Sequence, residues 1–204
     1  MTRSDETIAL ALDLFWRKGY SETSMAEIVA ATGQNRYALY SDFGSKREIF
    51  LAALDAYFEQ GRAQFEPGML DESIHPLVRI RDSLALMIEV METQGSGCFI
   101  CHVAIDCVSD DPAIERAVGE YFRRILEAVE ITMIHAREAG VLNPGLAPAE
   151  AAQIFLDAKL SMGVWQKAGG GRPALERIAS ATLAALAGPG ALDALPQSTA
   201  LQPH

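Results

Sequence analysis

Residues 19–50, GYSETSMAEIVAATGQNRYALYSDFGSKREIF, decide the fold of the N-terminal part of this 204-residue chain. Within them, Ser24 and Glu27 have the spacing of a capping box, in which each side chain accepts a hydrogen bond from the other residue's backbone amide. The box predicts a short helix that ends near the next glycine. Asn35 is a second residue of the N-cap type, and it predicts another very short helix over residues 36–41.

Two short helices joined through a glycine-containing turn have the dimensions of a helix-turn-helix, whose second helix lies in the major groove of DNA. Arg36 can bind a guanine edge through two hydrogen bonds, and Tyr37 and Tyr40 can reach phosphates or a thymine methyl group. A generic helical hairpin with a solvated polar face has the same local pattern, so the spacing alone leaves both interpretations open.

The residues expected to contact DNA come from this hairpin and from the start of the next helix. Thr23 and Ser24 would offer free backbone amides to a phosphate, and Lys46 would add a charge directed at the DNA backbone. The complete set is Thr23, Ser24, Arg36, Tyr37, Tyr40, Ser41 and Lys46.

Helical spacing of apolar residues recurs along the rest of the chain and predicts an all-α fold of about nine helices. Ser4 is the expected cap of a first helix that ends at Gly19, and a capping box at residues 45–48 opens a long helix expected to break at residues 66–68. Five further helices are expected over residues 76–94, 98–108, 112–140, 148–168 and 173–187. Residues 189–204 show no sustained period, and we expect a disordered tail there.

The run at residues 19–50 resembles the N-terminal domain of the TetR family of bacterial transcription regulators, and the match extends over about residues 5–55. The residues in register with the family's pattern are Phe15, Gly19, Tyr20, Thr23, Ser24, Ile28, Gly33, Leu39, Tyr40, Phe43, Ser45 and Lys46. The resemblance implies an Ω-shaped homodimer of nine or ten helices. Residues 1–46 would then form the helix-turn-helix DNA-binding domain, and residues 47–188 a ligand-binding and dimerisation domain.

The same resemblance implies the partners: a palindromic or near-palindromic double-stranded operator, a small-molecule effector and a second copy of the chain. The homodimer would form through the last two helices. Small residues on those helices permit close helix approach and favour this interface, and an alanine-rich composition is the alternative explanation. They are Ala158, Ser161, Gly163, Ala179 and Ala185.

Three residues depart from the family's pattern and indicate an unusual operator. Gln34 stands where the turn residue is usually apolar, and Tyr37 stands where the recognition helix usually has a small residue. Asp42 stands where a neutral or basic residue is more common. An acidic side chain would repel phosphate, so we expect Asp42 to turn toward Lys46 or Arg47.

The charge distribution confines DNA binding to the N-terminal part of the chain. The formal net charge is −10, of which residues 1–48 carry only −1. The negative net charge therefore argues against a protein that binds nucleic acid phosphates non-specifically over its whole surface. Neither an apolar run of about 18 residues nor a signal peptide is present, so we expect a cytoplasmic protein without a membrane partner.

Large apolar residues on the middle helices are typical of a pocket for an apolar or aromatic effector. They are Met87, Met91, His102, Ile105, Phe122, Phe155 and Trp165. For any single methionine or phenylalanine, ordinary core packing is the better interpretation, and for His102 a hydrogen-bonded structural role is the better one.

The cysteines Cys98, Cys101 and Cys107 lie within ten residues of one another. Cys98 and Cys101 share a helix face, and a thiol at a helix N-terminus has a lowered pKa, so these two are redox-sensor candidates; structural packing is the alternative. A metal site formed with His102 would lack a fourth ligand, so no metal is expected.

Taken together, these patterns predict a DNA-binding repressor that is released from its operator by a small apolar or aromatic effector, with no cofactor and no enzymatic activity. An alternative keeps the DNA-binding function and replaces the effector by oxidation or electrophilic modification at Cys98 and Cys101. A more distant alternative is a thiol oxidoreductase, against which stands the absence of a predicted β-sheet or a nucleophile–base motif.

Overall fold

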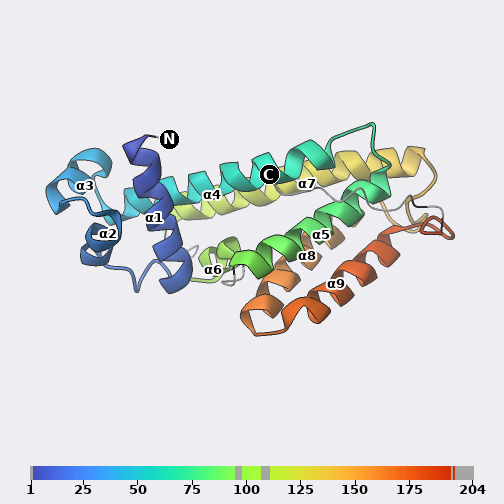
Figure 1. Cartoon of the computed structure of the whole chain (residues 1–204). Helices are drawn as coiled ribbons and strands as arrows, with labels where there is room; N and C mark the ends of the chain where they lie inside the picture. Colours follow the sequence, from blue (N-terminus) through green and yellow to red (C-terminus); the bar gives the residue numbers. More distant parts are fainter. Residues whose placement is uncertain (1, 95–97, 107–110, 194, 196–204) are drawn as a thin grey trace. The chain divides into compact units, whose positions relative to one another are not determined.

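The computed structural model describes residues 2–94, 98–106, 111–193 and 195 of the chain. Within these ranges the backbone forms nine helices and an isolated β-bridge between Leu142 and Ala187 (Figure 1). The predicted all-α fold is confirmed. None of the helices in the described ranges combines the length and the apolar content that a membrane span requires.

The helices follow one another along the chain with short connections. They are α1 (Arg3–Lys18), α2 (Met25–Thr32), α3 (Arg36–Phe43), α4 (Lys46–Met69), α5 (Pro76–Gln94), α6 (Phe99–Asp106), α7 (Pro112–Glu138), α8 (Pro148–Lys167) and α9 (Gly171–Leu186).

Local capping explains where the first three helices begin. Ser24 caps α2 through the expected box with Glu27, and the Asn35 side chain accepts a hydrogen bond of 2.8 Å from the Ala38 amide at the start of α3. The expected cap of α1 is wrong. Thr2 rather than Ser4 caps this helix, because Thr2 and Asp5 form a capping box of their own.

The expected break of α4 at residues 66–68 is also wrong, since the helix continues through Pro67 to Met69. A proline inside a helix removes one backbone donor and weakens the helix around it. Here the last carbonyl of α4 has partners from distant elements: Thr132 Oγ1 donates to the Met69 carbonyl at 2.7 Å and Arg79 Nη1 donates to it at 3.3 Å. These bonds satisfy a helix end that the sequence pattern predicts to terminate earlier.

The residues pack into two compact units. Unit 1 consists of Met1–Ala63 and Phe99–Tyr121, and unit 2 consists of Gln64–Cys98 and Phe122–His204. Both α4 and α7 contribute residues to each unit. The boundaries at residues 46 and 188 proposed from the sequence concern function and stay predictions. Of the predicted tail, residues 194 and 196–204 lie outside the described part of the chain.

Unit 1 is held by α1, α2 and α3 packed around buried apolar side chains and by a cluster of aromatic rings. Phe15 of α1 meets Phe50 of α4 edge to face at 5.0 Å between ring centroids. The ring centroid of Phe99, at the start of α6, lies 5.4 Å from that of Tyr57 of α4 and 5.7 Å from that of Trp16 of α1. Aromatic contacts of this kind add to the stabilisation from burial. They fix α1, α4 and α6 against one another.

Unit 2 is a helical layer in which α9 packs on both α5 and α8 (Figure 1). Its fully buried side chains include Phe155 of α8, Leu175 of α9 and Met133 of α7. Gln166 of α8 donates a hydrogen bond of 3.3 Å to the Met91 carbonyl at the end of α5. This unit therefore contains most of the residues that the sequence assigns to a ligand-binding region.

Candidate nucleic-acid interface

Lys46 lies at the first position of α4 and holds the turn between α1 and α2. Its ammonium group donates to the carbonyls of Tyr20 and Thr23, each at 2.9 Å, and lies 4.3 Å from the centroid of the Tyr20 ring. Two donors and the aromatic contact thus serve the protein itself. The structure gives Lys46 a role in positioning the hairpin, and its predicted contact with the DNA backbone stays a prediction.

The N-terminus of α2 differs from the expectation of free amides at Thr23 and Ser24. The Ser24 amide donates to Glu27 Oε2 at 2.8 Å, and the Thr23 side chain is buried with its hydroxyl donating to the Gly19 carbonyl at 2.7 Å. Hydrogen bonds from Lys18 and Ser24 lower the pKa of Glu27 to about 2. An ionised carboxylate therefore occupies the position expected to receive a phosphate.

The outer face of α3 presents the side chains predicted to contact DNA bases. Tyr37 is 84% exposed, and Arg36, Tyr40 and Ser41 are exposed beside it. The Arg36 guanidinium lies 5.6 Å from the centroid of the Tyr40 ring and 3.5 Å from its hydroxyl. Leu39, on the opposite side of α3, is fully buried. One apolar residue therefore anchors the helix while its polar and aromatic side chains remain available.

Gln34 and Asp42, two of the three departures from the family pattern, have different surroundings in the structure. Gln34 is buried and donates to Thr7 Oγ1 of α1, so it shapes the packing of the turn rather than a DNA contact. The expected turn of Asp42 toward Lys46 or Arg47 is wrong. Arg47 instead binds Asp111, whose pKa it lowers to about 2, and Asp42 has no ion pair within the described ranges.

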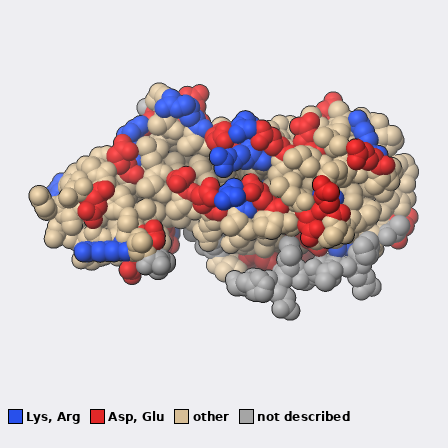
Figure 2. All heavy atoms as spheres, turned by 90° about the horizontal axis from the view of Figure 1, so that it is seen from above, with Lys and Arg blue, Asp and Glu red and all other residues tan. Residues whose placement is uncertain are grey.

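Half of the basic side chains of unit 1 pair with neighbouring carboxylates in the described structure. The pairs are Arg17 with Asp13, Lys18 with Glu27, Arg47 with Asp111 and Arg62 with Glu59. Figure 2 shows basic and acidic side chains interspersed over the face that it presents. Affinity for DNA would therefore depend on a few unpaired cations such as Arg36 rather than on a broad basic surface.

Comparison with known proteins agrees with this geometry. Residues 8–53 match the family model described as bacterial regulatory proteins of the tetR family. The chain is 32% identical over 98 residues to the HTH-type transcriptional repressor ComR of Escherichia coli, and the match spans 47% of each chain. The chain is therefore similar to the TetR family over residues 8–53. Its matched segment covers only about half of that relative, so ComR's own activity is not transferred by the match.

Two solved TetR-like structures share the fold over almost the whole chain. Escherichia coli NemR in its reduced form superposes with a TM-score of 0.83 at 17% identity, covering 92% of this chain and 98% of NemR. A cysteine mutant of the TetR-family regulator CifR, in complex with a 26-base-pair operator duplex, gives a TM-score of 0.79 at 19% identity and covers 89% and 95%. At these identities the likeness establishes the TetR fold alone.

The residues predicted to bind an effector differ in burial and do not all belong to the same unit. Phe155 is fully buried and Met91 nearly so, whereas Trp165 is 52% exposed. Met87, Met91, Phe122, Phe155 and Trp165 belong to unit 2, but His102 belongs to unit 1. The Ile105 side chain lies outside the described part of the structure. These assignments stay predictions.

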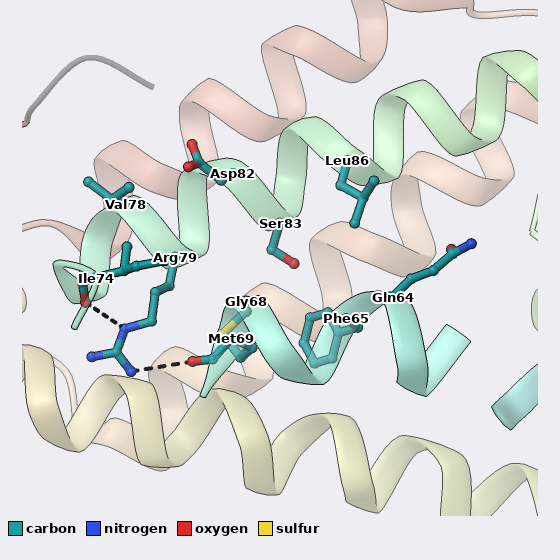
Figure 3. A pocket seen from close by; sticks show the side chains of 10 residues that line it. All are labelled: Gln64, Phe65, Gly68, Met69, Ile74, Val78, Arg79, Asp82, Ser83 and Leu86. Carbon is teal, nitrogen blue, oxygen red and sulfur yellow. Dashed lines mark hydrogen bonds between the residues drawn. The ribbon is translucent and has the colours of Figure 1, made fainter. Parts of the chain in front are cut away.

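Two cavities within unit 2 have linings that the sequence analysis missed. One, of about 70 Å³, lies between the last turns of α4 and the first half of α5 (Figure 3). Arg79, Ser83 and Leu86 line it from α5 at spacings of four and three residues, which places them on one helix face. This spacing identifies a shared helix face but not the cavity, which depends on how α4 packs against α5. The other, of about 150 Å³, lies between α5 and α9 and includes Ser180.

The cysteine cluster is only partly described, since Cys107 lies outside the described residues. Cys98 and Cys101 are both buried. The high exposure expected of a reactive thiolate is therefore not present at either sulfur. Within the described ranges, no group of three or more potential metal-ligating side chains converges, and this includes Cys98, Cys101 and His102.

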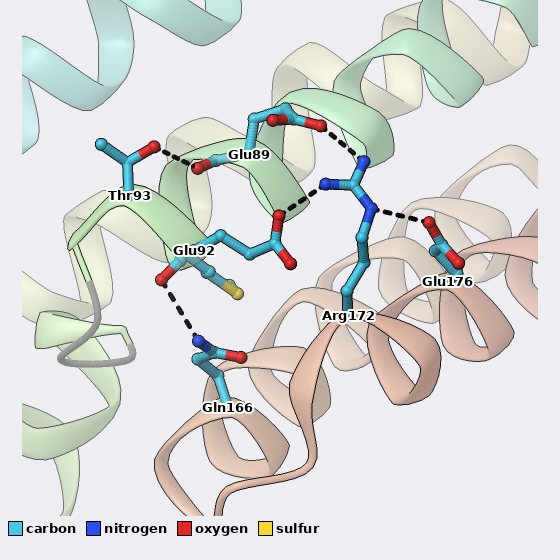
Figure 4. A network of polar contacts seen from close by, with 7 residues as sticks. Glu89, Glu92, Thr93, Gln166, Arg172 and Glu176 are labelled. Carbon is cyan, nitrogen blue, oxygen red and sulfur yellow. Dashed lines mark hydrogen bonds and ion pairs between the residues drawn. The ribbon is translucent and has the colours of Figure 1, made fainter.

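Helices α8 and α9, the predicted dimer helices, expose some apolar surface in the single chain. Val164 and Trp165 of α8 are 53% and 52% exposed. Of the small residues expected at the interface, Ala158 and Gly163 are buried inside the unit. The start of α9 is held to α5 by Arg172, which pairs with Glu89 and Glu92 of α5 and with Glu176 of its own helix (Figure 4). Their charges raise the Arg172 pKa.

Proposed function

We propose that this chain is a transcriptional repressor that binds a palindromic operator as a homodimer and is released by a small apolar or aromatic effector. The observation that carries the proposal is the exposed face of α3, formed by Arg36, Tyr37, Tyr40 and Ser41 on a helix whose opposite side is buried. In a helix-turn-helix, this face is the one that enters the major groove.

The chemistry of this face suits base recognition. Tyr37 is a large ring with most of its surface in water, where it contributes little to the stability of the isolated chain. Arg36 stacks on Tyr40 without pairing with a carboxylate in the described structure, so its guanidinium keeps donors for a guanine edge. The CifR complex with operator DNA supports the use of the same fold for this purpose.

The dimer would form through α8 and α9. Exposed Val164 and Trp165 on α8 supply apolar area of the kind found in the core of a homodimer interface. A two-fold dimer would present two copies of α3 to two half-sites, which is why a palindromic operator is expected. The 26-base-pair duplex in the CifR complex is long enough for two half-sites one turn apart.

Effector binding would act through α4. This helix begins at Lys46, which holds the α1–α2 turn, and ends at Met69, whose carbonyl is bound by α5 and α7. An effector among the apolar residues of unit 2 would shift the end of α4, and the shift would reach the turn that positions α3. A coupling of about 1–3 kcal/mol lowers operator affinity roughly 5- to 150-fold, which is sufficient for derepression.

The test is fluorescence anisotropy of labelled DNA fragments from upstream of the protein's own gene, titrated with the full chain. We expect sequence-selective binding that Arg36→Ala abolishes. Arg17→Ala is the matched control, because Arg17 is an exposed arginine of the same unit that pairs with Asp13. Equal binding by wild type and Arg36→Ala would refute the assignment of α3, and loss of binding in Arg17→Ala would move the interface to α1.

A second input, oxidation or alkylation of Cys98 or Cys101, is favoured by one structural observation. Phe99 lies between these cysteines in the sequence, and its ring contacts Trp16 of α1 and Tyr57 of α4. A modified thiol beside this ring would disturb the packing of the DNA-binding unit. Peroxide should then release the DNA from wild type but not from Cys98→Ser or Cys101→Ser, and release from both variants would reject this input.

A further inference from the structure

The cavity between α4 and α5 has an apolar wall and four polar residues in its lining, Gln64, Arg79, Asp82 and Ser83 (Figure 3). Phe65 and Met69 of α4 face Leu86 of α5 across it, and Arg79 and Ser83 are the two polar residues of the lining that are buried. Its volume of about 70 Å³ is roughly half that of a cavity of about 150 Å³ known to hold benzene. A molecule of about three to five non-hydrogen atoms therefore fits.

The hydroxyl of Ser83 is the first sign that this cavity takes a ligand. The residue is 93% buried, with 7% of its surface exposed, and its oxygen has no hydrogen-bond partner in the described structure. Figure 3 shows the side chain directed from α5 toward Phe65 and Met69. Native proteins retain few buried polar groups without partners, and a group of this kind at a cavity wall is available to a bound molecule.

The guanidinium of Arg79 is the second sign. The residue is only 4% exposed, and its donors reach the Ile74 carbonyl at 2.8 Å and the Met69 carbonyl at 3.3 Å. Arg79 Nη1 also lies 3.4 Å from His135 Nδ1. No carboxylate in the described ranges pairs with Arg79 directly, and burial lowers its pKa against the longer-range charges of Glu72 and Asp71. A buried cation without a direct carboxylate partner favours an anion nearby.

We propose that this cavity binds a short-chain carboxylate. One carboxylate oxygen accepts a hydrogen bond from Ser83, the Arg79 guanidinium balances the charge, and the alkyl chain contacts Phe65 and Leu86. Asp82 also borders the cavity, but it pairs with Arg81 at 2.9 Å and Figure 3 shows it directed away from Ser83. It therefore leaves the positive end of the cavity to Arg79.

Binding has a consequence for α4, and this consequence alone rests on the proposed function. Arg79 donates a hydrogen bond to the carbonyl of Met69, which is the last residue of α4. A carboxylate that attracts the guanidinium weakens this bond and loosens the final turn of the helix. Occupancy of the cavity then adjusts operator affinity through α4, independently of a larger effector elsewhere in unit 2.

The experiment uses propanoate as the probe, titrated into the full chain without DNA and followed by calorimetry and by ligand-observed NMR. Ser83→Ala should weaken binding at least tenfold while leaving the melting temperature unchanged or raised, because the hydroxyl has no partner to lose. Ser180→Ala in the α5–α9 cavity is the matched control and should bind as wild type does. Ser83→Val, which fills the space, should abolish binding.

Several outcomes would overturn the proposal. Absence of propanoate binding to wild type removes the site, and equal affinity in wild type and Ser83→Ala places the probe elsewhere. Butanone has a similar size and a carbonyl acceptor but no charge, so binding as tight as that of propanoate would remove the role of Arg79. None of these results depends on DNA, so a failure here is distinct from a failure of the repressor proposal, which the operator titration alone decides.

Discussion

The role of Lys46 gives the sharpest prediction, because the structure and the sequence pattern assign different contacts to it. Lys46→Met keeps the aliphatic stem and removes the ammonium group that donates to the Tyr20 and Thr23 carbonyls. Hydrogen bonds to a charged group contribute about 1.5–3 kcal/mol each, and the contact with the Tyr20 ring about 0.5–1 kcal/mol. The side chain is half-buried, so water compensates part of this loss. We expect the free energy of unfolding to fall by about 2–3 kcal/mol.

The assay is urea unfolding at one fixed protomer concentration, since a dimer's apparent stability depends on concentration. Operator affinity is measured in parallel by anisotropy. Arg36→Ala is the comparison variant. Its guanidinium is exposed and makes only a long contact with Tyr40, so stability should change by less than about 0.5 kcal/mol while base discrimination falls by about 1–3 kcal/mol.

The opposite pattern would refute this reasoning. If Lys46→Met unfolds as wild type does but binds the operator more weakly, with the salt slope reduced by about one per lost phosphate contact, then Lys46 serves the DNA backbone and not the turn. The hydrogen bonds to Tyr20 and Thr23 would in that case be energetically unimportant.

Three further predictions test the charges and the buried polar groups. First, with half of the basic side chains of unit 1 already paired with carboxylates, a homodimer making about six phosphate contacts should show a slope of log affinity against log salt near −5, and a slope beyond −9 would contradict the paired state. Second, Arg47 lowers the Asp111 pKa from 3.8 to about 2, so the stability from this pair is present above pH 3.8 and is lost as the pH falls toward 2; urea midpoints should drop more steeply over this range in wild type than in Asp111→Asn. Third, Gln34→Leu removes a buried carbonyl oxygen without a partner, so the melting temperature should rise by a few degrees, corresponding to about 1 kcal/mol, and a fall would show that the bond to Thr7 dominates.

Features that depend on neighbours three or four residues away could be predicted from the sequence. The capping box of Ser24 and Glu27 and the cap at Asn35 are such features, because the atoms that bond are fixed by helix geometry once the residues are known. The error at the start of α1 is of the same kind. A capping box needs an N-cap residue and a suitable side chain three residues later, and Thr2 and Asp5 form such a pair. This pair, rather than Ser4, determines the first residue of the helix.

Features that depend on distant partners could not be predicted. Lys46 finds its acceptors 23 and 26 residues earlier, and both are backbone carbonyls, which every residue carries and no motif identifies. The cavity beside Ser83 exists only because the end of α4 packs against α5, and the spacing of residues along one helix does not reveal a gap between two. Apolar residues such as Trp165 were for the same reason assigned to a pocket although half of the side chain is exposed.

The two ends of α4 share a chemical feature that explains why this helix suits the transmission of a signal. Its 24 residues span about 36 Å. At its first residue, the Lys46 side chain donates to two carbonyls of the α1–α2 turn, and at its last residue the Met69 carbonyl accepts hydrogen bonds from Arg79 of α5 and Thr132 of α7. Such bonds break completely over small displacements, since hydrogen bonds weaken steeply with distance and angle. A shift at Met69 too small to disturb the apolar core would therefore be large enough to break the bonds that Arg79 and Thr132 donate to its carbonyl. In the proposed function, α4 would carry such a shift to the α1–α2 turn, which requires only about 1–3 kcal/mol of differential binding from a ligand.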